Sequence, residues 1–171
     1  MKPKTLTISA LFVLLIIGLL AWGNAAKGGT ASVQGTPPAS ASASALVAPL
    51  AFHDFGTISM KNGNVSKEFT VTNPTSEDIT VKTVLTSCMC TNAFIVGADG
   101  SVKGPFGMPG HGGAVAPANE TIAAGESRII RVVYDPNAHG PAGVGRVDRF
   151  ITLTDDSGRT LEYEIKANVT P

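Results

Sequence analysis

Residues 65–86 read VSKEFTVTNPTSEDITVKTVLT, two alternating segments separated by a polar one. Period-two alternation of apolar and polar side chains predicts half-buried β-strands. The polar segment NPTSED between them has the composition of a turn. The residues expected to face inward are Val65, Lys67, Phe69 and Val71 in the first strand, and Ile79, Val81, Thr83 and Leu85 in the second.

Toward the C-terminus the alternation returns at residues 150–154 and 161–165, and residues 129–134 form a β-branched run that also predicts a strand. Turn sequences precede or separate these segments at 123–126 and 155–158. Short strands with turns at this spacing predict an all-β fold, an immunoglobulin-like β-sandwich of about seven to eight strands. The single Trp is Trp22 and the two cysteines are two positions apart. The Cys-Trp-Cys core of antibody domains is therefore missing, and apolar packing must hold the sandwich together.

The N-terminal residues 1–26 have the pattern of a membrane-targeting segment. Lys2 and Lys4 precede an uncharged stretch from residue 5 to residue 26. This stretch would reach across a hydrocarbon core of about 30 Å as a helix. A cleaved signal peptide and a retained transmembrane anchor both fit the pattern. Lysines before the stretch favour an N-terminus inside and a C-terminal domain outside the cytoplasm.

Residues 27–49 consist almost entirely of Ala, Ser, Gly, Thr and Pro. Such a composition cannot bury enough apolar surface to offset chain entropy, so it predicts a flexible linker. A spacer after an apolar segment favours the anchor over the cleaved signal. We therefore expect a single-pass protein of the cell membrane with an extracytoplasmic domain at residues 50–171, or a secreted domain if the leader is cleaved.

The charge balance limits the classes of partner. The chain has 13 Lys+Arg and 13 Asp+Glu, and charged residues make up 15% of it. Without residues 1–26 the remainder has a net charge of −2. A basic surface is what nucleic-acid binding requires, so we expect no nucleic-acid partner. The expected partners are the membrane, through residues 5–26, and an unidentified protein.

Four short motifs occur in a recognisable order: AFHDFGTI at 51–58, EFTVTN at 68–73, TSCMCT at 86–91 and AGES at 124–127. Together they resemble the bacterial family called domain of unknown function 1573, over roughly residues 51–170. The resemblance implies an immunoglobulin-like fold, similar to Hydin-type domains of ciliary and centrosomal proteins, in an exported protein without known enzymatic activity. The chain departs from the family in Met89, which replaces a glycine, in the additional His53, and in a longer Gly/Pro-rich insertion at 94–122.

Cys88 and Cys90 are the only cysteines, and outside the cytoplasm they would meet an oxidising compartment. Residues i and i+2 of a strand point the same way, about 6.5–7 Å apart. A disulfide between them therefore requires a tight local turn. Four interpretations stay open at this point: a local structural disulfide, two thiolate ligands of a soft metal, a redox-active pair, and simple apolar packing.

Residues 104–113 form a Gly/Pro-rich segment that is expected to be a loop. It contains Met108 and His111, a thioether and an imidazole. With Cys88 and Cys90 these side chains would make a set suited to Cu(I), and less well to zinc. Alternatively, Phe106 and Met108 pack the loop onto the sandwich and His111 is exposed. A second Gly/Pro-rich loop, at 135–145, contains His139 and is expected to be structural.

The sequence contains no nucleophile-elbow, metalloprotease or phosphate-loop motif. We therefore expect a protein that is not an enzyme, a membrane-tethered protein-interaction or structural module. Two alternatives remain: a copper-binding envelope protein and a thiol redox protein.

Overall fold

The computed structural model describes residues 43–110 and 116–171, which belong to one compact unit beginning at Ala41. The predicted leader at 1–26, most of the predicted linker at 27–49, and His111 lie outside the described residues. Within the described ranges, no helix has the length and apolar character needed to cross a membrane.

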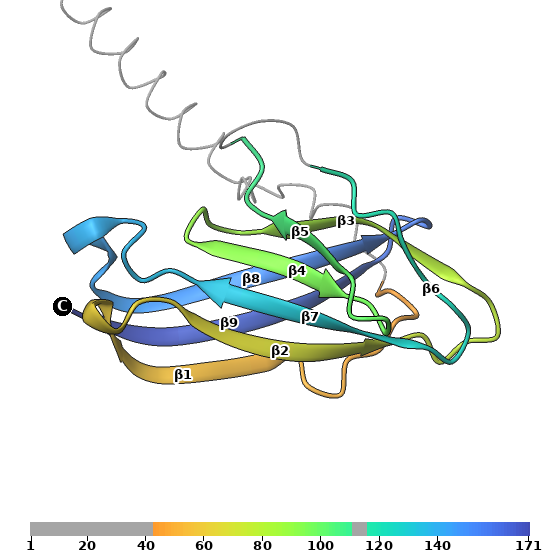
Figure 1. Cartoon of the computed structure of the whole chain (residues 1–171), viewed down its shortest axis with the longest axis horizontal. Helices are drawn as coiled ribbons and strands as arrows, with labels where there is room; N and C mark the ends of the chain where they lie inside the picture. Colours follow the sequence, from red (N-terminus) through yellow and green to blue (C-terminus); the bar gives the residue numbers. More distant parts are fainter. Residues whose placement is uncertain (1–42, 111–115) are drawn as a thin grey trace, which may run out of the picture. The chain divides into compact units, whose positions relative to one another are not determined.

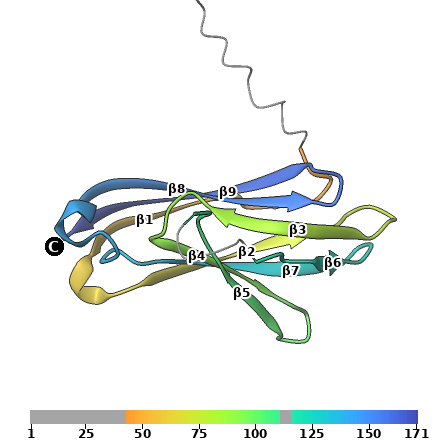
Figure 2. The same cartoon turned by 90° about the horizontal axis from the view of Figure 1, so that it is seen from above.

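Two β-sheets face each other in this unit (Figures 1 and 2). In order across the five-stranded sheet lie β1 (Phe52–Ser59), β9 (Thr160–Thr170), β8 (Gly145–Asp155), β3 (Ile79–Thr86) and β6 (Glu120–Ile122). Across the four-stranded sheet lie β2 (Val65–Thr72), β7 (Ser127–Tyr134), β4 (Thr91–Val96) and β5 (Val102–Phe106). Two short 3-10 helices, η2 (Met60–Asn62) and η3 (Gly140–Gly143), follow β1 and precede β8. The predicted β-sandwich is confirmed, with nine strands in the described part instead of seven to eight.

The core lies between the two sheets and consists of the inward side chains of alternating strands. Phe69 of β2 packs against Tyr163 of β9 with ring centroids 4.8 Å apart, which joins the two sheets. Both side chains are buried, as are Val71, Ile130 and Ile151. Apolar burial of this kind is the main favourable contribution to folding, at about 25 cal/mol per Å².

Strand β3 does not keep one inward face along its whole length, which corrects the prediction. Its pairing with β8 shifts register between Val81 and Thr83. A bulge adds one residue to one strand and so exchanges the two faces beyond it. Val84 and Thr86 are therefore buried, whereas Thr83 and Leu85, which alternation predicted to face inward, are half-buried.

The predicted loop at 104–113 is also corrected, because its first residues complete the edge strand β5. Phe106 is buried and pairs with Ala93 of β4, which explains why the segment adds to the sheet. Pro105 is tolerated because an edge strand leaves one row of backbone groups unpaired. The sequence did not reveal β4 either. Of its three inward residues, Thr91 and Ala93 are small and only Ile95 is large, and its Phe94 is only half-buried.

The structure differs from the predicted boundary between linker and domain at residue 50. Leu46 keeps only 3% of its surface exposed and belongs to the core. Val47 forms an isolated bridge with Thr72, and Ala43 forms one with Thr160. The last residues of the predicted linker are thus part of the sandwich.

Candidate functional site

The cysteines lie in a tight turn between β3 and β4. The backbone N–H of Thr91 donates to the carbonyl oxygen of Cys88 at 3.1 Å, which closes the turn. The buried Thr86 hydroxyl lies 3.0 Å from the carbonyl oxygens of both Cys88 and Thr91. Just after β7, the N–H of Asp135 donates to the Cys90 carbonyl at 2.8 Å. These bonds fix the turn from both of its sides.

Cys88 and Cys90 are joined in a disulfide, with their Cα atoms 5.3 Å apart. This is shorter than the i to i+2 distance of an extended strand, so the turn is what makes the bond geometrically accessible. Met89 lies between them with 47% of its surface exposed. Among the described residues other than glycine, only Asn119 has a positive φ. Met89 therefore adopts an ordinary backbone conformation, and a glycine is not required at this position.

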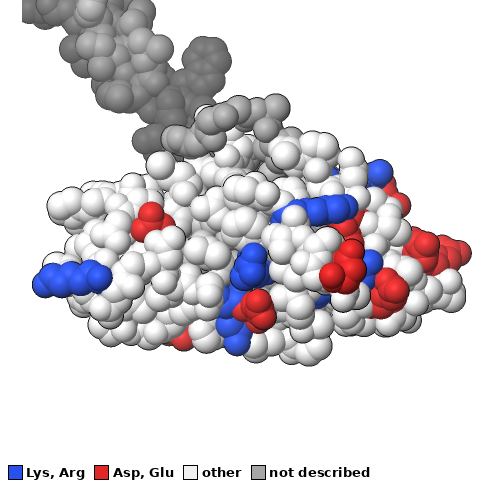
Figure 3. Space-filling model, viewed as in Figure 1, with Lys and Arg blue, Asp and Glu red and all other residues white. Residues whose placement is uncertain are grey.

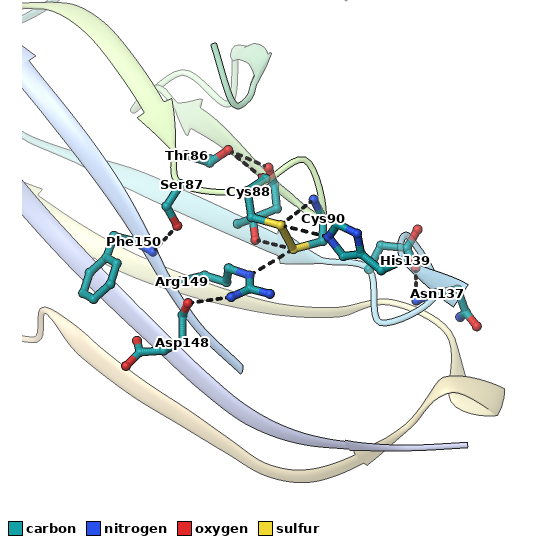
Figure 4. Close-up of a disulfide and its surroundings, with 11 residues drawn as sticks. Thr86, Ser87, Cys88, Cys90, Asn137, His139, Asp148, Arg149 and Phe150 are labelled. Atoms are coloured by element: carbon teal, nitrogen blue, oxygen red, sulfur yellow. Dashed lines mark hydrogen bonds between the residues drawn. A yellow bond between two sulfur atoms is a disulfide. The ribbon is translucent and has the colours of Figure 1, made fainter. Parts of the chain in front are cut away.

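His139 contacts the disulfide from the loop between β7 and β8 (Figure 4). Its Nε2 lies 3.1 Å from Cys88 Sγ. Two hydrogen bonds of Asn137 hold this loop: its N–H donates to Asp135 Oδ1 at 2.8 Å, and its side-chain amide donates to the Met60 carbonyl at 2.9 Å. The imidazole is therefore presented by an anchored segment.

Arg149 of β8 contacts the other sulfur, and its Nε donates to Cys90 Sγ at 3.2 Å. The turn between β3 and β4 also fixes the backbone next to Arg149. The N–H of Phe150 donates to Ser87 Oγ at 2.9 Å, and the N–H of Ser87 donates to the Phe150 carbonyl at 3.0 Å. Figure 4 shows this arrangement, with Arg149 and His139 both directed at the disulfide. Each sulfur thus has its own polar neighbour.

Of the predicted metal ligands, the structure brings Cys88 and Cys90 together. It places His139 beside them, a histidine that was not among the predicted ligands. Donor atoms of Cys88, Cys90 and His139 all lie within 4.8 Å of one another. Met108 is half-buried in the segment after β5, where the Gly107 carbonyl accepts from Thr86 N–H at 3.2 Å. His111 lies outside the described residues. Copper or zinc binding by the predicted set stays a prediction.

Sequence reasoning placed His139 in a structural loop and missed its contact with the cysteines. Thr91 begins β4 and pairs with Tyr134, which ends the antiparallel strand β7, so the cysteine turn before Thr91 and the loop after Tyr134 meet at one end of the sheet. Recognition of β4 as a strand would have provided this signal. Arg149 was missed for a related reason, since its position depends on the pairing of β3 with β8.

A cavity of about 290 Å³ opens beside the disulfide. Its lining includes His139 and Arg149, the two side chains that contact the sulfurs. The remaining lining residues are Ala142, Gly143, Val144, Arg146 and Val147. Cations that face a disulfide would stabilise the thiolates formed when it is reduced. The arrangement is therefore suited to thiol chemistry, whereas metal binding would first require reduction, because only a thiolate is a metal ligand.

No protein-family model matches the sequence, and no curated protein matches it. Solved structures do share the fold. A protein of unknown function from Porphyromonas gingivalis is 13% identical, with a TM-score of 0.52 over 79% of this chain and 51% of that one. This chain thus spans about half the length of that protein.

Two further structures align less well. The VesB protease of Vibrio cholerae is 16% identical, with a TM-score of 0.46 over 72% of this chain and 31% of that one. The ASH/PapD-like domain of human CEP192 is 12% identical, with a TM-score of 0.47 over 75% of this chain and 87% of that one. At these identities a likeness concerns the fold alone. The described part of the chain is an immunoglobulin-like β-sandwich domain.

Proposed function

We propose that the chain is a membrane-tethered, extracytoplasmic β-sandwich module that contacts another protein and is not an enzyme. Residues 5–26 would hold it in the cell membrane, and the following spacer would hold the sandwich away from the lipid. The charged N-terminus, the uncharged stretch and the Ala/Ser-rich spacer support this arrangement. The resemblance to domain of unknown function 1573, itself still a prediction, implies the same location.

The observation that carries the interaction proposal is a strip of exposed apolar side chains where the chain enters the sandwich. Val47, Leu50 and Phe52 expose 46%, 48% and 44% of their surfaces. Three large apolar side chains within six residues are more than the isolated exposed side chains that any surface contains. We call these three residues the entry strip.

The entry strip leads into a sheet edge. Phe52 begins β1, which pairs with β9 on one side and is the last strand of its sheet in the described part of the chain. An edge strand offers unpaired backbone N–H and C=O groups to an added strand, and neighbouring side chains provide specificity. The combination suits a partner that adds an extended apolar segment along β1.

Charge gives this surface little selectivity. On the face shown in Figure 3, Lys and Arg side chains lie next to Asp and Glu side chains. Beside the entry strip, Lys166 lies over the Phe52 ring, 5.4 Å from its centroid, and also pairs with Glu164 and Asp148. The partner is therefore expected to be recognised by apolar and backbone contacts more than by net charge.

Site-specific photo-crosslinking in living cells tests the proposal. A photoreactive residue would replace Phe52 in the full chain, and in a matched variant it would replace Val102, which is 50% exposed on the edge strand β5. We expect one discrete adduct from position 52 and none of that mass from position 102. The adduct should disappear when Leu50→Ser is added.

The location is tested in the same cells by a reporter that is active only outside the cytoplasm, fused after Pro171. An inactive reporter would mean that the domain is not outside the cytoplasm, and this would overturn the proposed location. Equal adducts from positions 52 and 102, or an adduct that survives Leu50→Ser, would overturn the entry strip as the docking surface.

A further inference from the structure

The two sulfurs of the Cys88–Cys90 disulfide differ in access and in their neighbours. Cys90 is fully buried, whereas Cys88 keeps 9% of its surface exposed. Cys90 Sγ accepts from Arg149 Nε at 3.2 Å and lies 3.7 Å from the Thr91 hydroxyl. An incoming nucleophile would therefore meet Cys88, and Cys90 would become the leaving sulfur. A guanidinium and a hydroxyl donor would stabilise the negative charge that develops there.

The cavity beside the disulfide presents cations that have no carboxylate partner. Among the ion pairs of the described residues, neither Arg146 nor Arg149 takes part. Asp148, between them in sequence, lies 3.4 Å from Lys166 Nζ instead. Arg149 Nη1 donates to the backbone carbonyl of Asp148 at 2.8 Å, a neutral acceptor. Two arginines and His139 thus line one small cavity.

The cavity is small and open to solvent. Its volume of about 290 Å³ is at the lower end for small-molecule sites, which are commonly about 300–1,000 Å³. Ala142, Val144 and Val147 add an apolar wall. A short aliphatic chain with one carboxylate matches this lining, because the chain would contact the wall and the carboxylate would face the arginines.

We propose that Cys88–Cys90 is an exchangeable disulfide whose substrates are small thiols that carry a carboxylate. This chemistry goes beyond the protein-contact function proposed above and does not depend on it. The carboxylate binds at Arg146 and Arg149, and this places the thiol sulfur near Cys88. Specificity for the charge of the thiol is what distinguishes this site from a solvent-exposed disulfide.

The exchange has two steps. In the first, the substrate thiolate attacks Cys88 Sγ; the new bond joins the substrate sulfur to Cys88, the Cys88–Cys90 bond breaks, and its electron pair leaves on Cys90 as a thiolate beside Arg149. In the second, another substrate thiolate attacks the substrate sulfur of this mixed disulfide. A small-molecule disulfide is released and Cys88 is left as a thiolate beside His139. The protein gains two electrons, and two substrate thiols are oxidised.

The test uses the full chain in detergent micelles and three thiols of similar size: 3-mercaptopropionate, 2-mercaptoethanol and cysteamine, which carry negative, neutral and positive groups. Intact mass spectrometry after acid quenching follows the mixed disulfide and the reduced protein with time. Because the thiols differ in intrinsic reactivity, the measured quantity is the ratio of the 3-mercaptopropionate rate to the 2-mercaptoethanol rate in each variant.

In the natural chain we expect this ratio to exceed that of Arg146→Gln by about fivefold, the effect of one partly exposed ion pair. Arg131→Gln, which removes an arginine that stacks on Phe94 outside the cavity, should leave the ratio unchanged. Cysteamine should show the opposite change in Arg146→Gln. Peptide mapping should place the first adduct on Cys88.

Four results would overturn the proposal. The first is a disulfide that resists all three thiols in the folded chain and yields to them only in guanidinium. The second is a rate ratio that is the same in the natural chain, Arg146→Gln and Arg131→Gln. The third is a first adduct on Cys90. The fourth is reduction that proceeds only when Cu(I) is added, since the cysteines would then be metal ligands and not an exchange site.

Discussion

The two ends of the sandwich are closed by different chemistry. At one end, called here the carboxylate end, the loops 73–78, 123–126 and 155–159 meet around the buried side chains of Asn73 and Asp155. At the other, the cysteine end, the turn 87–91 and the loop 135–144 meet around a disulfide, with a cavity and an exposed Met89 beside it. The first end satisfies its own polar groups, and the second leaves cations and apolar surface available.

The carboxylate end has an acceptor for each of its buried donors. Asn73 donates to the carbonyls of Glu77 and Ile122 at 2.7 and 2.9 Å, and its own Oδ1 accepts from Thr75. Asp155 accepts from the Ser44 hydroxyl at 2.7 Å and from the N–H groups of Ser157 and Arg159 at 3.0 and 2.9 Å. A saturated network of this kind stabilises a fold and has no free group for a ligand. We infer that the carboxylate end is structural and that the chemistry is confined to the cysteine end.

Among substitutions of polar residues, the largest effect on stability is expected from Asp155→Ala. The substitution leaves several donors of the 155–159 hairpin and of Ser44 without an acceptor inside the fold, at a cost of about 3 kcal/mol. Urea unfolding followed by circular dichroism would measure the loss. Asp156→Ala is the matched control, because Asp156 is adjacent and exposed, and should change the unfolding free energy by less than about 0.5 kcal/mol. Equal losses in the two variants would contradict a special role for Asp155.

The Asp155 carboxylate also makes the free energy of unfolding depend on pH. Burial alone would raise the pKa of Asp155, but the hydrogen bonds from Ser157, Ser44 and Arg159 outweigh burial and lower it. A carboxyl whose folded pKa is depressed contributes stability above its unfolded pKa, about 3.9, and loses it as the pH falls through the folded value.

The difference in unfolding free energy between the natural chain and Asp155→Asn should therefore be largest at neutral pH and should shrink below about pH 4. Glu120, whose pKa is lowered by Lys103 and Arg128 against the opposing effect of burial, is common to both proteins and cancels in the difference. A difference that stays constant from pH 7 to pH 3 would contradict the role of the ionised carboxylate. Urea midpoints at several pH values provide the measurement.

How far the sequence predicts the structure differs between the two ends. The turns of the carboxylate end were predicted, since local composition specifies them: Asn-Pro-Thr-Ser-Glu-Asp at 73–78 and Asp-Asp-Ser-Gly at 155–158 are turn sequences by themselves. Gly158 has φ 78°, a conformation that glycine adopts without cost. Strands β2, β8 and β9 were likewise evident from alternation, and β7 from its β-branched run.

The cysteine end was predicted only in part, because its geometry depends on contacts that are distant in sequence. His139 reaches Cys88 across 51 residues, and Arg149 reaches Cys90 across 59. Both contacts depend on strand pairings that alternation does not specify, and β4 was not recognised as a strand. The bulge in β3 had no local signal either, although it decides that Thr86 is buried.

A smaller loss of stability, about 1–2 kcal/mol, is expected from Thr86→Val at the cysteine end. Valine has nearly the same shape as threonine but lacks the hydroxyl. The Thr86 hydroxyl donates to the buried carbonyl oxygens of Cys88 and Thr91, so the substitution removes their shared donor. Thr80→Val on the same strand is the control, because the Thr80 hydroxyl is at the surface and contacts only Thr121 Oγ1. Thermal unfolding should show a lower Tm for Thr86→Val than for Thr80→Val. A loss as large as that of Asp155→Ala would remove the contrast between the two ends.

The smallest effect is expected from Met89→Ala, which should change the unfolding free energy by less than about 0.5 kcal/mol. Met89 keeps 47% of its surface exposed at the tip of the cysteine turn, and it does not belong to the hydrophobic core. Ile95→Ala, in the core on the adjacent strand β4, should by contrast cost about 2–5 kcal/mol. If the cysteine turn is held by Thr86 and by the backbone bonds from Asp135 and Thr91, its tip residue can vary freely in size and polarity. A loss above about 1 kcal/mol in Met89→Ala would mean that the side chain covers part of the site, and the cysteine end would then be as closed as the carboxylate end.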